Sequence, residues 1–348
     1  MKFSKTIFLG EHKISENGKV FFIAEAGVNH CGDLHCALKL IDLAKRAGAD
    51  AVKFQSFQAE SLVLPTVERA VYQRRAIKAG ASQFEMLKSL EFGPEKMRRL
   101  KRYCDQRGIL ILITFFEEQS LEACADMDLA AFKVASTDIT NLPFLRRIAK
   151  KRKPIILSTG MACLKEVELA LREIHPYNRD VILLQCTANY PIKDEDAHLR
   201  VMETFRKKFD ILVGYSDHSS GVGAAPYAAA FGACVVEKHF TFDKSLAGPD
   251  HKASLDPNEL AQCIREIRRV EKFLGSPEKK LTLDEKSNRR HLQKCLVAAC
   301  EIREGDRFSE RNVIAKRTGG KGLSPIRCRH VWGRRARRAF RKDEVIVP

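Results

Sequence analysis

Eight short apolar runs recur along the chain, and segments with helical spacing lie between them. After the first run, Leu34, Leu38, Ile41 and Ala44 recur at three- and four-residue steps, and Gly48 follows as a typical helix stop. Continuous apolar strands that alternate with helices indicate a parallel sheet covered on both faces. The runs are FFIAEAG (21–27), DAVKFQ (50–55), ILILITFF (109–116), AAFKVAS (130–136), PIILSTG (154–160), VILLQCT (181–187), ILVGYSD (211–217) and CVVEKHF (234–240).

Eight strand–helix units in about 260 residues predict an α/β protein with a (β/α)8 TIM barrel. An open doubly wound sheet is the structural alternative. The first turn between a strand and a helix, EAGVNHCGD, contains no GxGxxG sequence, which argues against a dinucleotide-binding site.

The character of the sequence changes after VEKFLGSPEKKLTLDEKSNRR. The rest of the chain consists of short strand-like pieces interrupted by Gly, Pro and Asp. We therefore expect a barrel domain over residues 1–280, a charged linker over 281–290 and a small β-rich domain over 291–348.

The net charge of the chain indicates which kind of partner it would bind. The formal net charge is +17, and much of the excess lies after residue 285, where WGRRARRAFRK is the densest run. A basic surface favours an acidic partner, either nucleic acid or a phosphorylated small substrate. The run lacks the interleaved aromatic residues of a stacking platform, so we expect no nucleic-acid partner.

Cysteine content and hydropathy indicate the compartment. The 11 cysteines form no CxxC pair, which fits reduced thiols in a cytosol better than a disulfide framework. No apolar run approaches the roughly 20 residues of a membrane span. The start of the chain, MKFSKTIFLGEHKISENGKV, lacks the apolar segment of a signal peptide. We expect a cytoplasmic protein with no membrane partner.

Polar or ionisable residues stand at the end of nearly every predicted strand. In a barrel, the C-terminal strand ends together build the active site. A buried charge costs several kcal/mol unless it is paired or bound to a metal, so any one such residue alone would indicate a structural ion pair. Their recurrence predicts one charged mouth. The residues are Glu25, Asn29, His30, Lys53, Gln55, Thr114, Lys133, Ser136, Ser158, Thr159, Gln185, Asn189, Tyr190, Ser216, Asp217, His218, Glu237, Lys238 and His239.

Two histidines, His218 and His239, end the last two predicted strands. Neighbouring strands lie about 4.8 Å apart, so two imidazoles could share one metal ion. With no third Cys or His nearby in the sequence, water and substrate would complete the coordination, as in an open catalytic site. The alternative is that His218 is a loop histidine and His239 a core histidine.

Two lysines, Lys53 and Lys133, lie within predicted strands. A lysine in a barrel strand is either a Schiff-base nucleophile or a fixed positive charge for an anion. Lysines among serines and threonines suggest a phosphate or carboxylate ligand. The structural alternative is a pair of lysines bridged to Glu25 and Glu237.

Several segments, taken in order along almost the whole chain, resemble the sialic acid synthase family. They include FIAEAGVNHCGDLHCALKLIDLAKRAGADAVKFQ, FKVASTDITNLPFL, ILSTGMA, LQCTANYP, VGYSDHSSG and EKHFTFDKSLAGPDHKASL. The C-terminal segment LVAACEIREGDRFSERNVIAKRTGGKG is similar to the antifreeze-like (SAF) domain that follows the barrel in that family.

The resemblance implies that phosphoenolpyruvate condenses with the open-chain aldehyde of an N-acetylated amino sugar, typically N-acetylmannosamine. Water addition and loss of phosphate through C–O cleavage would follow. The resemblance further implies a divalent metal, usually manganese or magnesium, that binds the aldehyde oxygen. Two other acceptors stay open: a diacetamido trideoxy sugar, which would give a legionaminic- or pseudaminic-type acid, and N-acetylmannosamine 6-phosphate.

The resemblance also implies roles for individual residues. The metal ligands would be His218 and His239. Positions that hold phosphoenolpyruvate correspond to Lys53, Thr114, Lys133, Ser136 and Ser216. Glu25 would lie at the phosphoenolpyruvate end of the site, and Tyr190 and Asp250 near the sugar. Asp138 stands where the family usually has a glutamate that handles sugar hydroxyls and protons.

Arg317, in AKRTGG, matches an arginine of the SAF domain. In the family this domain reaches over the barrel of the partner subunit, so the resemblance implies a domain-swapped homodimer. The chain departs from the family pattern at Ile113 in place of a serine, at Gln185 in place of a histidine and at Ala188 in place of an asparagine. These departures bear on the identity of the sugar more than on the chemistry.

Two other classes of protein remain open. A Schiff-base aldolase on the same barrel would use Lys53 or Lys133 as nucleophile. A binding protein would hold nucleic acid or another polyanion on its basic C-terminal segment, but it would leave the charged strand ends unexplained.

Overall fold

The computed structural model describes residues 1–70, 73–74 and 82–347 of the chain. The chain divides into two compact units, Met1–Gly275 and a smaller unit that begins at Ser276. The predicted boundary at residue 280 therefore lies five residues inside the second unit. Within the described ranges, no helix combines the length and apolar character that crossing a bilayer requires.

The first unit contains a closed barrel of eight parallel strands in the order β10-β3-β4-β5-β6-β7-β8-β9. Each predicted apolar run forms one strand, so the predicted TIM barrel is confirmed and the open sheet is excluded. The strands are β3 (Phe21–Gly27), β4 (Ala51–Ser56), β5 (Leu110–Phe115), β6 (Phe132–Val134), β7 (Ile155–Ser158), β8 (Val181–Cys186), β9 (Leu212–Asp217) and β10 (Val235–His239).

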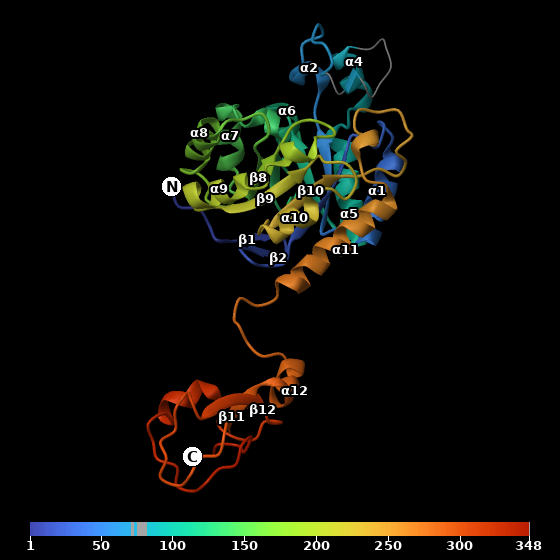
Figure 1. Cartoon of the computed structure of the whole chain (residues 1–348). Coiled ribbons are helices and arrows are strands. Elements are labelled where there is room, and N and C mark those ends of the chain that lie inside the picture. Colours follow the sequence, from blue (N-terminus) through green and yellow to red (C-terminus); the bar gives the residue numbers. More distant parts are fainter. Residues whose placement is uncertain (71–72, 75–81, 348) are drawn as a thin grey trace. The chain divides into compact units, whose positions relative to one another are not determined.

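Helices between the strands cover the outside of the barrel (Figure 1). They include α1 (Leu34–Ala47), α5 (Pro94–Arg107), α6 (Glu118–Ala123), α7 (Leu142–Lys150), α8 (Leu164–Ile174), α9 (Val201–Phe209), α10 (Ala225–Ala230) and α11 (Pro257–Leu274). The short helices α2 (Ala59–Leu62) and α4 (Gln83–Leu90) lie beyond one end of the barrel. The predicted first helix is confirmed: the Asp33 carboxylate accepts a hydrogen bond from the Cys36 N–H at 3.0 Å, and Gly48 ends the helix with a φ of 88°.

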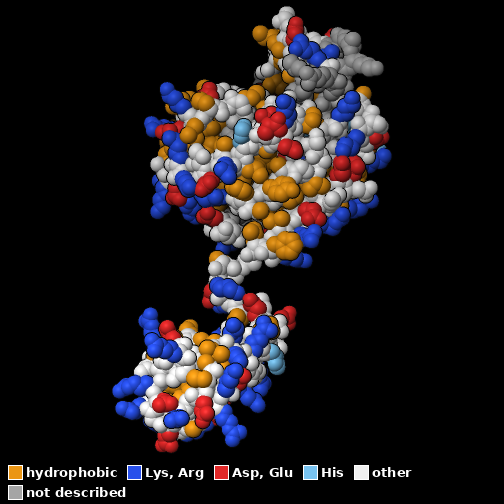
Figure 2. All heavy atoms as spheres, viewed as in Figure 1, with side chains coloured by type: hydrophobic (Ala, Val, Ile, Leu, Met, Phe, Trp, Pro, Cys, Tyr) orange, Lys and Arg blue, Asp and Glu red, His pale blue; other side chains and the backbone are white. Residues whose placement is uncertain are grey.

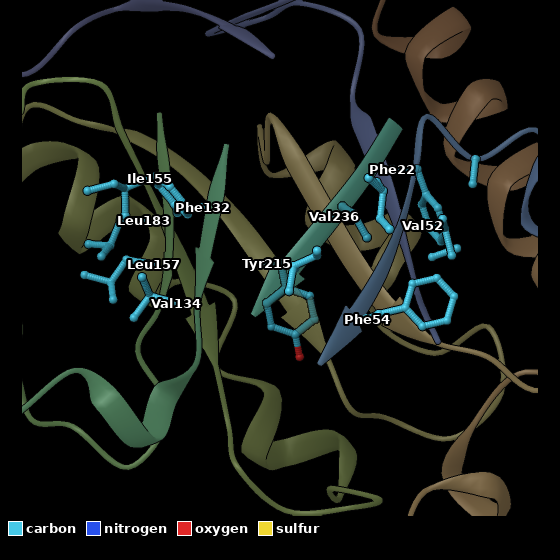
Figure 3. Packing of buried hydrophobic residues seen from close by; sticks show 14 of the residues in the cluster. Phe22, Val52, Phe54, Phe132, Val134, Ile155, Leu157, Leu183, Tyr215 and Val236 are labelled. Carbon is cyan, nitrogen blue, oxygen red and sulfur yellow. The ribbon is translucent and has the colours of Figure 1, made fainter. Parts of the chain in front are cut away.

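Alternation along the strands creates two apolar layers, because successive side chains point to opposite faces. Phe22, Val52, Tyr215 and Val236, from four neighbouring strands, belong to the outer layer between strands and helices (Figure 3). Side chains on the other face point into the barrel and form the inner apolar layer. Its members include Phe21, Ile23, Ala51, Leu112, Ile156, Ile182, Leu184, Leu212 and Val235.

An N-terminal hairpin, which the sequence patterns did not predict, closes the barrel at the amino ends of the strands. Strands β1 (Thr6–Leu9) and β2 (His12–Ser15) pair antiparallel. Their buried side chains Ile7, Leu9 and Ile14 join the inner apolar layer. Because this end is closed by hydrocarbon, the carboxyl ends of the strands form the accessible end of the barrel interior.

The second unit contains helix α12 (Leu283–Leu292), an antiparallel strand pair β11 (Lys294–Ala298) and β12 (Val313–Arg317), and the 3-10 helix η4 (Pro325–His330). Most of the predicted linker over 281–290 is thus helical, and Thr282 and Glu285 form the capping box that starts α12. A small apolar cluster around Leu296 and Phe340 forms the core. Figure 2 shows Lys and Arg side chains over much of the visible face of this unit.

Candidate active site

A cavity of about 640 Å³ opens at the carboxyl ends of the barrel strands. It is lined by side chains from all eight strand ends or the loops that follow them. The structure therefore brings together almost every residue assigned to the site from the sequence. The assigned residues that line the cavity are Glu25, Lys53, Thr114, Lys133, Ser136, Asp138, Tyr190, Ser216, His218, His239 and Asp250. Arg317 belongs to the second unit, where it is exposed at the end of β12.

Four buried charges form the floor of this cavity. The Lys53 Nζ lies 3.0 Å from Glu25 Oε2 and 3.4 Å from Glu237 Oε2, and the Lys133 Nζ lies 3.5 Å from Glu237 Oε1. The strand pleat explains this grouping, because the four residues occupy the inward positions directly above the inner apolar layer. All four side chains are at most 5% exposed.

Hydroxyl groups surround the two ammonium groups. Lys53 donates a hydrogen bond to Thr114 Oγ1 at 3.2 Å, and Lys133 donates to Ser158 Oγ at 2.7 Å. Ser216 donates from Oγ to Glu237 Oε1 at 3.0 Å. The floor thus offers fixed positive charge together with hydroxyl donors, which is the chemistry that binds phosphate and carboxylate.

Burial and ion pairing shift the pKa values of the floor residues in different directions. Burial raises the pKa of Glu25 to about 7, although Lys53 opposes the shift. Burial disfavours the Glu237 carboxylate, but Lys133 and Lys53 outweigh it and lower the pKa of Glu237 to about 2. Burial also lowers the pKa of Lys133 to about 8. Glu25 is therefore the carboxyl of the floor that exchanges a proton near neutral pH.

The histidine pair lies beside this floor. The ring centroids of His218 and His239 are 5.7 Å apart, and the Tyr190 ring lies over His218 at a centroid distance of 4.0 Å. The His218 Nδ1–H donates to the Thr187 carbonyl at 2.7 Å, which directs the lone pair of a neutral imidazole to Nε2. Burial disfavours the His218 imidazolium, but the neighbouring Cys186 thiol and this carbonyl raise its pKa.

His239 has a nitrogen that fits a metal ion. Burial lowers the pKa of His239 well below its usual value, so the imidazole is neutral. Its Nδ1 is buried and has no hydrogen-bond partner among the described residues, and Asp250 Oδ2 lies 3.9 Å away. Within the same described ranges, no three His, Cys, Asp or Glu side chains converge as a ready metal site. The two histidines fit a metal as protein ligands of an open site, with further positions left to water and substrate.

Two more carboxyl groups line the upper part of the cavity. Burial raises the pKa of Asp138 to about 6, and hydrogen bonds from Asn141 and Thr137 oppose the shift. Burial likewise raises the pKa of Asp250 to about 6. These groups can gain or lose a proton in the physiological range.

Some strand-end residues predicted to share the mouth do not reach the cavity. Lys238 and Asp217 point outward and pair with each other at 2.7 Å, and Gln185 donates to the Ala197 carbonyl at 3.3 Å outside the barrel. Asn29 donates to the Phe240 carbonyl and to Ser254 Oγ, and His30 stacks on the Phe92 ring. The prediction was wrong for Lys238, Asp217 and Gln185 because it treated every residue of a strand end as inward-facing, whereas the pleat turns alternate residues away. Asn29 and His30 lie in the turn after β3, where these contacts hold them outside the cavity.

The residues that depart from the family pattern also differ in whether they reach the cavity. Ile113 belongs to the outer apolar layer, whereas Ala188 lines the cavity. The sequence patterns also missed an apolar group in the cavity, which comes from loops and short helices without a periodic signal. Its members are Val28, Phe57, Leu62, Met86, Leu87, Leu90 and Phe116.

Known proteins similar to this chain include named legionaminic, pseudaminic and N-acetylneuraminate-9-phosphate synthases. The model of the NeuB family matches residues 40–279. An N,N'-diacetyllegionaminic acid synthase of Legionella pneumophila is 42% identical over 320 residues, which make up 90% of this chain and 90% of the relative. The human N-acetylneuraminate-9-phosphate synthase is 36% identical over 329 residues, 94% of this chain and 91% of the relative.

A solved structure extends the similarity to three dimensions. The crystal structure of an N-acetylneuraminic acid synthetase from Leptospira borgpetersenii, in complex with citrate, matches with a TM-score of 0.73 and 34% sequence identity. The match covers 84% of this chain and 98% of that chain. These similarities extend over the barrel that carries the cavity, and they confirm the resemblance indicated by the sequence motifs. The chain belongs to the NeuB family.

Proposed function

We propose that this chain condenses phosphoenolpyruvate and water with the open-chain aldehyde of a diacetamido trideoxy sugar, forming a legionaminic-type nonulosonic acid and releasing phosphate. One observation carries the proposal: the cavity joins a buried lysine floor, suited to a multiply charged anion, to two histidine rings whose centroids lie 5.7 Å apart. The 42% identity to the Legionella legionaminic acid synthase, against 36% to the human enzyme, supports this acceptor.

N-Acetylmannosamine is the second candidate acceptor. It is the acceptor that the motif resemblance implies first, and the similar Leptospira structure is named an N-acetylneuraminic acid synthetase. Both candidates require the same floor and the same histidines, so they differ in the sugar-binding part of the cavity.

The lysine floor would bind phosphoenolpyruvate. Lys53 and Lys133 would face the phosphate and carboxylate, and Thr114, Ser136, Ser158 and Ser216 would donate hydrogen bonds to their oxygens. Charge–charge attraction is strong here because the lysines are almost completely buried. Glu25, whose pKa is about 7, would hold or release a proton beside this anion.

His218 and His239 would hold a divalent cation, Mn²⁺ or Mg²⁺, through the nitrogens described above. When bound, the cation would supply Lewis-acid polarisation of the aldehyde oxygen. Tyr190 and Asp250 line the cavity next to the histidines and would orient the aldehyde end of the sugar. Asp138 would exchange a proton with a sugar hydroxyl, because its pKa of about 6 makes both protonation states available.

The second unit would complete the site in a domain-swapped homodimer. In this proposal it is an SAF domain, and Arg317 of one copy binds the sugar in the barrel of the other copy. The exposure of Arg317 at the end of β12 supports the proposal, because the guanidinium is available to a ligand.

The experiment is a phosphate-release assay with phosphoenolpyruvate, Mn²⁺ and each sugar in turn: the diacetamido trideoxy sugar, N-acetylmannosamine and its 6-phosphate. We expect release that requires both a sugar and the metal and that EDTA abolishes. No release with any sugar by a metal-loaded protein would contradict the proposal. Borohydride treatment during turnover separates this chemistry from an aldolase, because only a Schiff base on Lys53 or Lys133 would be trapped.

A further inference from the structure

We propose that one side of the cavity is a subsite for the deoxygenated and acylated part of the acceptor sugar, and that it selects against hydroxylated and phosphorylated acceptors. This inference rests on the proposed function. We call this side the apolar wall and define it as Val28, Phe57, Leu62, Met86, Leu87, Leu90 and Phe116.

The apolar wall is a defined cluster assembled from several elements. Val28, Phe57 and Phe116 follow strands β3, β4 and β5, and the other members come from helices α2 and α4. Phe57 and Phe116 meet edge to face, with ring centroids 6.1 Å apart. A capping box between Ser82 and Glu85 fixes the start of α4. The wall is therefore held by packing rather than by one mobile loop.

The apolar wall faces the same cavity as the charged floor. Val28, Phe57, Met86 and Leu90 are buried in the structure, while Leu62 and Leu87 are half-buried, and all of them line the cavity. A packed apolar cluster that also lines an open cavity offers hydrocarbon to whatever occupies it.

The Lys and Arg side chains described in the cavity lie in its floor. Among the described residues that line the cavity, the only Lys or Arg side chains are Lys53 and Lys133, and both are paired with carboxylates of the floor. Ser61, Gln73 and Gln83 contribute neutral polar groups beside the apolar wall. A phosphate placed against this wall would meet no cation from these lining residues.

These surroundings match one acceptor better than the others. In the proposed function the aldehyde carbon lies at the histidines and the floor, so the remaining carbons of the sugar occupy the rest of the cavity, which the apolar wall lines. A diacetamido trideoxy sugar carries a methyl group at C6 and acetamido methyl groups, which gain by contact with hydrocarbon. N-Acetylmannosamine would place a C6 hydroxyl there, and its 6-phosphate a dianion, and both groups lose water when they are buried.

Polar substitutions in the apolar wall test the inference. We expect Leu62→Gln and Met86→Gln each to lower kcat/KM for the diacetamido trideoxy sugar about 10-fold relative to N-acetylmannosamine, with KM for phosphoenolpyruvate unchanged. Leu62 is half-buried, so that variant retains the fold even if Met86→Gln does not. The matched control is Leu64→Gln, because Leu64 lies on the same segment, is 71% exposed and does not line the cavity.

A gain-of-charge variant tests the same subsite in the opposite direction. Leu87→Arg is expected to raise the use of N-acetylmannosamine 6-phosphate relative to the unphosphorylated sugar. Unchanged sugar selectivity in all three wall variants, or an equal change in the Leu64→Gln control, overturns the inference. A wild-type protein that prefers the trideoxy sugar, with wall variants that leave this preference unchanged, overturns the inference alone. A wild-type protein that is active without this preference overturns the proposed acceptor as well, and one with no phosphate release overturns the proposed function as a whole.

Discussion

Lys238 and Asp217 form a buried ion pair on the outer side of the barrel, between strands β10 and β9. The Lys238 Nζ lies 2.7 Å from Asp217 Oδ2, and their side chains are 1% and 0% exposed. Lys238 also donates to the Ser219 carbonyl at 2.8 Å, and the Ser219 N–H donates to Asp217 Oδ1 at 2.9 Å. His218 lies between Asp217 and Ser219, so this pair fixes the backbone on both sides of it.

Removing one partner of this pair is expected to weaken metal binding as well as folding. Lys238→Met leaves Asp217 buried without its partner, which costs about 3–5 kcal/mol of stability. The double variant Lys238→Met/Asp217→Leu replaces the pair by hydrocarbon and should recover much of that loss. If the pair positions His218, the recovered double variant still binds Mn²⁺ more weakly than the wild type. Urea unfolding and titration of free Mn²⁺ measure the two effects, and wild-type Mn²⁺ affinity in the double variant would exclude a positioning role.

His239→Ala is expected to lose Mn²⁺ binding and nearly all turnover while remaining folded. The fold should tolerate the change because Nδ1 of His239 is buried without a hydrogen-bond partner among the described residues, so little native bonding is lost. His35→Ala is the control, since His35 is an exposed histidine on helix α1. Full activity in His239→Ala would refute its assignment as a ligand.

Asp138 is expected to make the folded protein less stable as pH rises from 3.8 to about 6. Its pKa is raised by burial from 3.8 to about 6, so in this window the folded state binds more protons than the unfolded state. The stability contributed by the protonated carboxyl is thus lost as the pH passes through the folded pKa. Asp138→Asn removes this dependence, and thermal midpoints of both proteins across the window measure it. A difference between the two proteins that does not vary with pH would count against the burial effect.

Arg317→Ala is expected to raise KM for the sugar and to leave KM for phosphoenolpyruvate and the thermal midpoint unchanged, because the side chain is exposed. Arg311→Ala is the control on the same unit, since Arg311 is also exposed. An effect on phosphoenolpyruvate alone would show that the arginine is misassigned.

Mixing two impaired variants tests whether Arg317 acts across subunits. A mixed dimer of Arg317→Ala and His239→Ala contains one barrel with intact histidines and one intact Arg317 on the other chain. Activity that appears on mixing indicates that the arginine is supplied by the partner. If mixing restores nothing although mixed dimers form, Arg317 does not serve the opposite barrel.

The barrel could be predicted from sequence because each parallel strand is buried on both faces and reads as an apolar run. Lys53, Lys133 and His239 could be predicted as site residues because a charge at the end of such a run has few structural explanations. Lys238 shows the limit of this reasoning, because only the pleat register distinguishes it from its neighbours Glu237 and His239. The apolar wall could not be predicted, since its members lie on separate loops and short helices that only the folded chain brings together.

If the four-charge floor binds an anion as proposed, binding exchanges one ion pair for another. Its two lysines and two carboxylates balance one another before any substrate enters. An arriving anion must displace a carboxylate from an ammonium group, and the displaced carboxylate is then a bare charge in a medium of low polarity. Glu25, whose pKa is about 7, can relieve this imbalance by taking up a proton. Anion binding should therefore consume protons, and calorimetry in buffers of different ionisation enthalpy would measure how many; no uptake would mean that the floor keeps both carboxylates charged.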